Sequence, residues 1–173
     1  MTLGGKRAVV LAENGYEDLE LWVPYYRLLE EGAEVVLAGH EKQTYSSKHG
    51  YPCEVDATVA SLNPKEFDAV VIPGGVAGPD RLRRHREVLD LVWKMDEDEK
   101  IVAAICHAAW VPISAGIVKG RRMTSYASVK DHCINSGAKW VDQECVVDGN
   151  LITSRSPDDL PAFCRAIVSA LSR

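Results

Sequence analysis

The sequence has no long apolar segment and no excess of positive charge. No stretch approaches the ~18 apolar residues that a membrane-spanning helix needs, and the first ten residues lack the apolar core of a secretory signal. Twenty Lys and Arg residues against 25 Asp and Glu residues give a formal net charge of −5. A nucleic-acid or anionic-membrane binder usually carries a broad basic surface. We therefore expect a cytoplasmic protein with no membrane partner and no specific nucleic-acid partner.

Paired cysteines, repeats and low-complexity segments are also missing. The five cysteines are odd in number and widely scattered, and they form no C-x-x-C pair. This argues against a disulfide framework and against a zinc site. The spacing of His40, His49, His85 and His132 is not typical of metal ligands, so no metal is predicted. No linker divides the chain, and residues 1–173 are predicted to form a single domain.

Short apolar runs alternate with helical patterns along the chain. The runs typical of buried parallel strands lie at 7–12, 35–38, 68–72 and 101–105. Later helices are expected over about 84–97, 107–115, 129–135 and 157–171, with a hairpin at 146–153. This alternation predicts an α/β fold with a mostly parallel sheet and helices on both faces.

The first helix is expected to open at Glu17-Asp18 and to end before Gly32. Its apolar side chains recur at helical spacing and define one face. That face consists of Leu19, Trp22, Tyr26 and Leu29. Pro24 lacks a backbone donor, so we expect a kink there or a helix that begins near it.

Three strand ends carry unusual residues. The segments 13–17, 73–75 and 106–107 each follow an apolar run directly. Open α/β sheets bind ligands beyond the carboxyl ends of their strands. We therefore expect these three segments to meet at one edge of the sheet and to form the functional site.

Cys106 lies in the most informative of these segments. Ala104 and Ala108 stand two residues before and after it, the small-residue pattern of a nucleophile elbow. A helix beginning at the elbow would favour the thiolate. A plain buried cysteine at a strand end explains the spacing equally well.

Each neighbouring residue has one functional and one purely structural interpretation. His107 is a base or acid for Cys106, or a polar residue beside a core strand. Glu17 is a functional carboxylate, or one favoured by a helix start. Gly74 and Gly75 present N–H groups to an oxyanion, or form a simple Pro-Gly turn.

The whole pattern resembles the PfpI family of intracellular cysteine peptidases, within the superfamily that includes the parkinsonism-associated deglycase. The likeness spans nearly the whole chain and implies a flavodoxin-like three-layer sandwich with no cofactor. The stretches that carry it are 15–21, 71–75, 104–107, 113–116, 119–121, 146–151 and 154–155.

The resemblance also implies roles for individual residues. Cys106 is the nucleophile, Glu17 the carboxyl group beside it and His107 the catalytic partner. The N–H groups of Gly75 and His107 form the oxyanion site, and Tyr126 lines the same pocket.

In peptidase-type members of the family, dimers associate into hexamers, and a Glu from a neighbouring subunit completes a Cys-His-Glu triad. Here Asp80 stands in that region instead, and Ala108-Ala109 replaces the usual Gly-Pro. Aspartate is one methylene shorter than glutamate, which weakens the expectation of a triad. A homodimer or hexamer is expected.

Three functions remain open on these residues. The first is a cofactor-independent hydrolase whose Cys106 attacks reactive carbonyls or glyoxal-type adducts, as in a deglycase or glyoxalase. The second is a cysteine peptidase that acts on short peptides. The third is a stress-protective redox sensor or chaperone with an oxidisable Cys106. We rank carbonyl chemistry first, because a thiolate attacks an aldehyde more readily than an unstrained amide.

Overall fold

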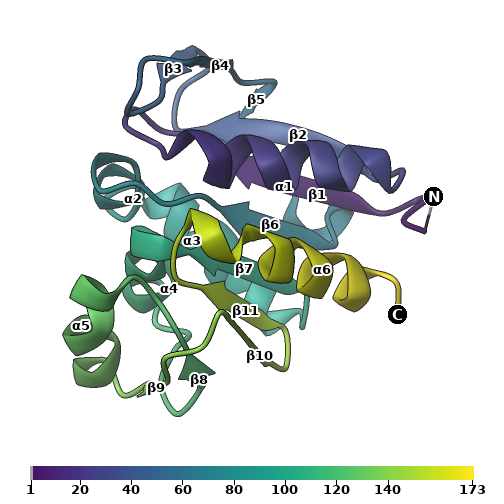
Figure 1. Cartoon of the computed structure of the whole chain (residues 1–173). Helices are drawn as coiled ribbons and strands as arrows, with labels where there is room; N and C mark the ends of the chain where they lie inside the picture. The colour runs from purple at the N-terminus through teal and green to yellow at the C-terminus, as the bar shows by residue number, and fades with distance from the viewer. Residues whose placement is uncertain (1) are drawn as a thin grey trace.

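A seven-stranded sheet crosses the molecule in the computed structural model, which describes residues 2–173 (Figure 1). Its strands, in spatial order, are β10 (Cys145–Asp148), β11 (Leu151–Ser154), β7 (Ile101–Ile105), β6 (Ala69–Ile72), β1 (Arg7–Leu11), β2 (Glu34–Gly39) and β5 (Ala57–Thr58). The hairpin β10–β11 is antiparallel, and the other neighbouring strands pair in parallel. The mostly parallel sheet predicted from the apolar runs is confirmed.

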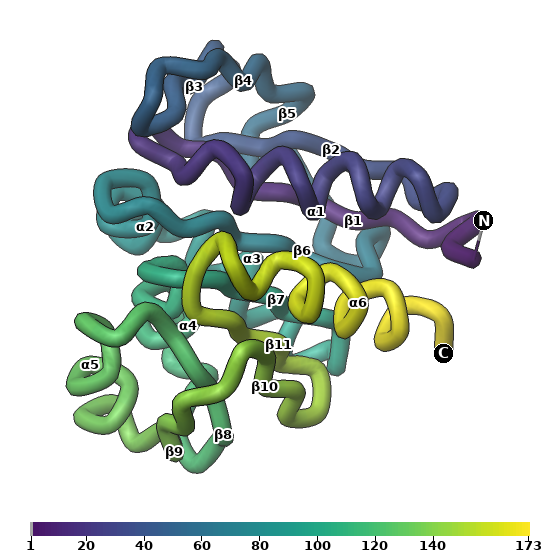
Figure 2. Tube along the Cα trace, viewed as in Figure 1, coloured from purple at the N-terminus to yellow at the C-terminus, as the bar shows by residue number. Residues whose placement is uncertain are grey.

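Helices cover both faces of the sheet. They are α1 (Asp18–Glu30), α2 (Ala77–Leu82), α3 (Arg86–Glu97), α4 (Trp110–Ser114), α5 (Lys130–Asn135) and α6 (Leu160–Leu171). One core cluster joins the sheet to α1 and α6, and a second joins it to α2, α3, α4 and α5. Figure 2 shows α6 beside α1, so the two ends of the sequence pack on the same face.

Short elements complete the chain outside the main sheet. Two small ribbons are formed by β3 (Thr44–Ser46) with β4 (Pro52–Glu54) and by β8 (Arg122–Met123) with β9 (Lys139–Trp140). Single turns of 3-10 helix lie at Val59–Ser61, Pro64–Glu66, Cys106–Ala109, Ala127–Val129 and Pro157–Asp159. The turn at Cys106 links β7 to α4 and is central to the site described below.

The apolar face predicted for helix α1 is mostly exposed. Of its four residues, Leu19, Tyr26 and Leu29 are exposed, and Trp22 is partly buried against the core. The buried positions include Glu20 and Pro24. The helix runs through Pro24 from its start at Asp18, so the alternative start near Pro24 is wrong. The end at Gly32 is confirmed, because this glycine has φ +92° and its N–H bonds to Leu29 O.

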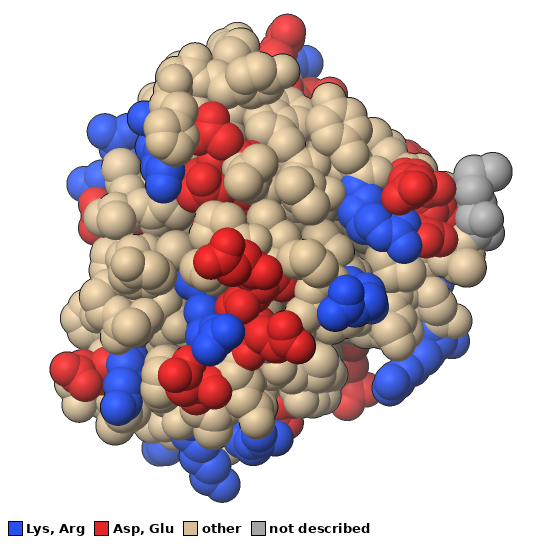
Figure 3. All heavy atoms as spheres, viewed as in Figure 1, with Lys and Arg blue, Asp and Glu red and all other residues tan. Residues whose placement is uncertain are grey.

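The surface carries charges of both signs. On the face that shows α1 and α6, Lys and Arg alternate with Asp and Glu, and no continuous basic area forms (Figure 3). Within residues 2–173, no helix has the length and apolar character needed to cross a membrane.

Candidate functional site

The three unusual strand ends come together as expected. Strands β7, β6 and β1 are direct neighbours and parallel, so their carboxyl ends lie at the same edge of the sheet. The loops after β1 and β6 are in contact, because Glu17 N donates a hydrogen bond to Gly74 O (3.0 Å). Gly75 has φ +86°, and a Cβ there would lie 2.4 Å from Gly15 O. The close approach of the two loops therefore requires glycine.

Cys106 stands on a sharp turn from β7 into the following 3-10 helix. Its φ is +65°, in the left-handed region that costs a non-glycine residue roughly 1–2 kcal/mol. Ala104 and Ala108 are almost completely buried on either side of it. The strained turn and its small neighbours match the nucleophile elbow predicted from the sequence.

His107 lies against the sulfur. Its Nδ1 is 3.2 Å from Cys106 Sγ, and its Nε2 is 3.2 Å from Ser128 Oγ. The ring stacks on Tyr126 at a centroid distance of 4.7 Å. Burial, and then the positive charge of Lys48, lowers the pKa of His107 below its ordinary value. The imidazole is therefore neutral near pH 7 and can accept a proton.

The carboxyl group beside Cys106 belongs to Glu20. Glu20 is fully buried, and its Oε2 accepts a hydrogen bond from Gly74 N (2.8 Å). Its other oxygen, Oε1, is buried and has no hydrogen-bond partner within residues 2–173. Burial, and then the charge of Glu17, raises the pKa of Glu20 to about 8. Glu20 thus holds a proton at neutral pH and can act as an acid.

Glu17, which the sequence assigned to that place, has a different position. Its Oε2 accepts a hydrogen bond from Glu20 N (3.0 Å) and so caps the start of α1. Its Oε1 lies 3.9 Å from Lys48 Nζ. Glu17 therefore supports the helix that carries Glu20. The signal that could have identified Glu20 is its spacing, since Glu17 and Glu20 lie one helical turn apart.

The thiol is less acidic than the elbow alone predicts. Burial, and then the charge of Glu20, raises the pKa of Cys106 to about 12, although the N–H groups of His107 and Gly75 act to lower it. The repulsion disappears when Glu20 is protonated, but the desolvation remains. Cys106 therefore needs a base for deprotonation, and His107 is within reach.

The backbone donors expected for an oxyanion lie around the sulfur. The N–H groups of Gly75 and His107 act to lower the pKa of the Cys106 thiol, whereas the Gly74 N–H donates a hydrogen bond to Glu20 Oε2. Gly74 also has no room for a side chain, because a Cβ there would lie 2.2 Å from Glu20 Oε2. The N–H groups of Gly75 and His107 therefore remain the predicted oxyanion donors, and Gly74 positions the acid.

Asp80 does not join Cys106 and His107 within the described chain. It lies on α2, half-exposed, with Oδ2 3.6 Å from Arg84 Nη2. The second nitrogen of His107 is instead in contact with Ser128. A contact from Asp80 to His107 of a neighbouring subunit stays a prediction.

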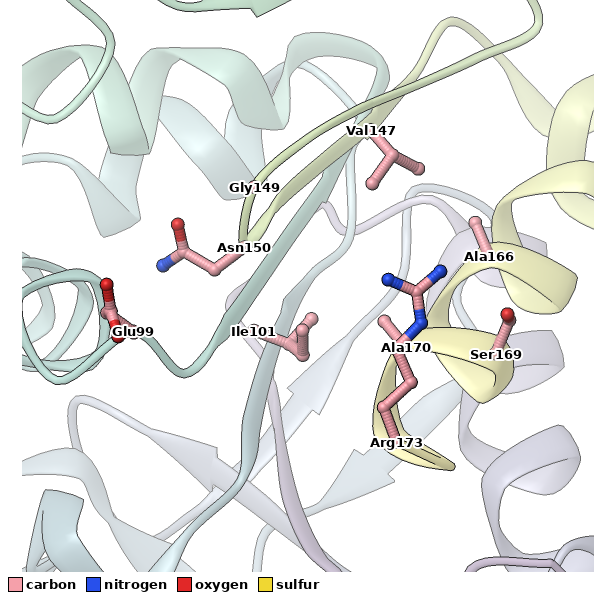
Figure 4. Close-up of a pocket in the computed structure, with 9 residues that line it drawn as sticks. All are labelled: Glu99, Ile101, Val147, Gly149, Asn150, Ala166, Ser169, Ala170 and Arg173. Atoms are coloured by element: carbon pink, nitrogen blue, oxygen red, sulfur yellow. The ribbon is translucent and has the colours of Figure 1, made fainter.

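A separate hollow of about 470 Å³ lies at the opposite end of β7 (Figure 4). Ile101, the first residue of β7, lines it together with Asn150 at the β10–β11 turn and Arg173. It contains no cysteine or histidine. The chemistry-bearing residues are therefore at the carboxyl edge, around Cys106.

The match to known proteins covers this whole arrangement. The sequence model of the DJ-1/PfpI family matches residues 6–170. The chain belongs to the DJ-1/PfpI family. The Pyrococcus furiosus protein named Deglycase PfpI is 47% identical over 165 residues, which cover 95% of this chain and 99% of that protein.

Two further members show the range of the DJ-1/PfpI family. General stress protein 18 of Bacillus subtilis is 37% identical over 172 residues, which cover 98% of this chain and 99% of that protein. The crystal structure of Drosophila melanogaster DJ-1beta superposes with a TM-score of 0.92 at 31% identity, covering 97% of this chain and 91% of that one. The flavodoxin-like α/β fold expected from the resemblance is confirmed.

Proposed function

We propose that this protein is a cofactor-independent hydrolase that uses Cys106 to attack reactive carbonyls or glyoxal-type adducts. The observation that carries the proposal is the Cys106 Sγ to His107 Nδ1 distance of 3.2 Å, next to the buried acid Glu20. The name of the Pyrococcus furiosus relative, a deglycase, supports the same reaction class.

The first step is addition of sulfur to an aldehyde or ketone carbon. His107 takes the thiol proton, and the sulfur electron pair forms the new C–S bond. The carbonyl π electrons move to oxygen, which then bears the negative charge. The N–H groups of Gly75 and His107 lie around the sulfur and stabilise this oxyanion. Glu20 donates its proton to the oxygen, and the product is a neutral hemithioacetal.

Later proton transfers use the same two groups. His107 carries the proton that it took from sulfur, and Glu20 is left as a carboxylate that accepts one. For methylglyoxal, the Glu20 carboxylate removes the proton from the sulfur-bearing carbon, the C–H electrons form an enediol, and return of a proton to the neighbouring carbon gives an enzyme-bound thioester. Water adds to the thioester carbonyl, the C–S bond breaks with its electron pair on sulfur, lactic acid leaves, and His107 returns its proton to sulfur. Tyr126 forms one wall, since it is partly exposed and stacked on His107.

Peptide hydrolysis remains the second candidate. A peptidase must protonate an amine leaving group and therefore needs His107 held as an acid. Ser128, which contacts His107 here, is neutral and does not stabilise an imidazolium as a carboxylate would. A partner subunit's carboxylate would have to supply that charge, for which Asp80 is the candidate.

The test compares methylglyoxal consumption and cleavage of a fluorogenic peptide panel on the same preparations. The variants are Cys106→Ser and, as a matched control, Cys145→Ser, because Cys145 is only partly buried and lies on β10. Carbonyl turnover lost only in Cys106→Ser supports the proposal. Cys106-dependent peptide cleavage without carbonyl turnover favours the peptidase. Inactivity in both assays leaves the stress-protective redox role, tested by stoichiometric oxidation of Cys106 with peroxide.

A further inference from the structure

A second cluster of chemistry-bearing side chains lies at the same sheet edge, beside β1 and β2. His40 directly follows β2, and Glu13 lies two residues after the end of β1. These strands are parallel neighbours, so their carboxyl ends meet. His85 and Glu87 come from the start of α3, which lies 45 residues further along the chain than His40. The fold therefore joins residues that sequence spacing keeps apart.

The side chains of this cluster are in direct contact. The rings of His40 and His85 are stacked, with centroids 3.7 Å apart and planes at 13°. His40 Nδ1 is hydrogen-bonded to Glu87 Oε1. His85 Nε2 lies 3.7 Å from Oε2 of Glu13, which is buried. One ligand atom from each of His40, His85 and Glu87 lies within 4.8 Å of the other two.

We propose that His40, His85 and Glu87 bind a divalent transition-metal ion of the zinc type, with Glu13 as a fourth ligand. Two imidazole nitrogens and a carboxylate oxygen are donors that zinc accepts, whereas magnesium and calcium prefer oxygen alone. The ion would connect the ends of β1 and β2 to α3. The site is separate from Cys106 and does not depend on the proposed hydrolase activity.

The cluster is open to solvent. A hollow of about 510 Å³, lined by Glu13, His40 and His85 among others, gives an ion and its water access to these three residues.

The two arginines that also line the hollow, Arg81 and Arg84, each contact an oxygen atom outside the proposed site. Arg84 lies 3.6 Å from Asp80, and Arg81 donates a hydrogen bond to Asn14 O (3.2 Å). Arg84 is therefore paired with a carboxylate, and Arg81 is held by a backbone carbonyl. The nearby carboxylates Glu13 and Glu87 offset them.

Only side-chain movement is needed to form the site. Zinc–ligand bonds of about 2.0–2.1 Å place tetrahedral donor atoms about 3.3 Å apart, so donors up to 4.8 Å apart must close in. The side chains of His40, His85 and Glu87 are 39%, 26% and 25% exposed and have space to rotate. The stacked rings would separate so that one nitrogen of each faces the ion.

The experiment is calorimetric titration of the chelator-treated full chain with Zn²⁺, using His40→Gln, His85→Gln and Glu87→Gln. His49→Gln is the matched control, because His49 belongs with Glu17 and Asp18 to another such cluster in the part of the chain described. We expect stoichiometric binding by the wild type and by His49→Gln. Affinity should fall at least about tenfold in each of the three cluster variants.

A second measurement does not depend on folding of the variants. The visible spectrum of the wild type with Co²⁺ should show nitrogen and oxygen coordination without a thiolate charge-transfer band, which excludes Cys106 as the ligand. Absence of stoichiometric Zn²⁺ binding by the wild type overturns the proposal. So does unchanged affinity in folded His40→Gln and His85→Gln, loss of binding in His49→Gln, or a thiolate band with Co²⁺.

Discussion

Replacing Glu20 by Gln should stabilise the protein at neutral pH while it reduces turnover. Glu20 is fully buried, and its pKa of about 8 compares with 4.5 for an ordinary glutamate. Gln has the shape of a protonated Glu and can accept the same hydrogen bond from Gly74 N. It cannot donate an acidic proton, so the Cys106 reaction loses its acid. Stability and activity should therefore change in opposite directions.

The magnitude follows from linkage between protonation and folding. A carboxyl whose folded pKa exceeds its unfolded pKa binds its proton more tightly when folded, so stability falls as pH rises between 4.5 and about 8. At pH 7 the difference 7 − 4.5 is 2.5 pH units, which corresponds to about 3 kcal/mol. Above the folded pKa it reaches 8 − 4.5, or 3.5 units, about 5 kcal/mol. The Glu20→Gln variant escapes this cost because its amide does not ionise in the unfolded chain.

The assay is urea unfolding of wild type and Glu20→Gln near pH 4.5, at pH 7 and above pH 8. The free energy of unfolding of the variant relative to wild type should rise across this series, by about 3 kcal/mol at pH 7 and about 5 kcal/mol above pH 8. Glu54→Gln is the control, and it should show no such gain because Glu54 is exposed on β4. A pH-independent difference between wild type and Glu20→Gln would falsify the assignment of Glu20 as a buried, protonated acid.

Three further predictions concern the same site. The rate of carbonyl turnover should rise with pH through the lowered pKa of His107, below 6.5, and fall near pH 8 as Glu20 ionises; a pH–rate profile without an alkaline limb contradicts this. Gly75→Ala should lose at least about 2 kcal/mol of unfolding free energy in urea, because its Cβ would lie 2.4 Å from Gly15 O at φ +86°. Gly50→Ala, with φ +88° and open space, should bear only the cost of φ and thus lose less; equal losses would show that the close approach is unimportant. Cys106→Gly should have a free energy of unfolding in urea about 1 kcal/mol higher than that of Cys106→Ala, because glycine adopts the φ of +65° found at Cys106 without strain; equal free energies would contradict this.

The sequence predicted the sheet well because the strands are buried on both faces. The runs at β1, β2, β6 and β7 are nearly all apolar. In a chain where such short runs alternate with helices, they are typical of strands in a parallel sheet. The elbow was also visible, since a sharp turn leaves room only for small residues at Ala104 and Ala108. Both signals are local, which is why they could be found without coordinates.

The side of α1 that packs on the sheet could not be predicted from the apolar pattern, for a physical reason. Helical spacing of Leu19, Tyr26 and Leu29 identifies an apolar face, but it does not say what that face contacts. In the structure these side chains are exposed, while the sheet side contains the buried acid Glu20. Hydrophobic patterning assigns a glutamate to the surface, so it cannot identify a buried functional carboxyl on the core side of a helix.

The short helix α2 and the His40–His85 contact were missed for different reasons. Helix α2 has only six residues and contains both Gly78 and Pro79, so its periodicity is too short to detect. The two histidines are 45 residues apart, and only the adjacency of β2 and α3 in space joins them. Such non-local contacts depend on topology, which spacing along the chain does not contain.

The protonation states of the site also support the proposed preference for carbonyls. At neutral pH the thiol of Cys106 and the acid Glu20 keep their protons, and His107 is neutral. The buried site thus avoids the cost of ionised groups until a substrate binds. An aldehyde oxygen can accept the charge that forms on attack and is then protonated by Glu20, so the adduct is again neutral. An amide requires in addition a lasting imidazolium and an expelled amine, and the described residues offer His107 no carboxylate to stabilise that ion. These protonation states therefore favour the proposed addition to a carbonyl over cleavage of a peptide bond.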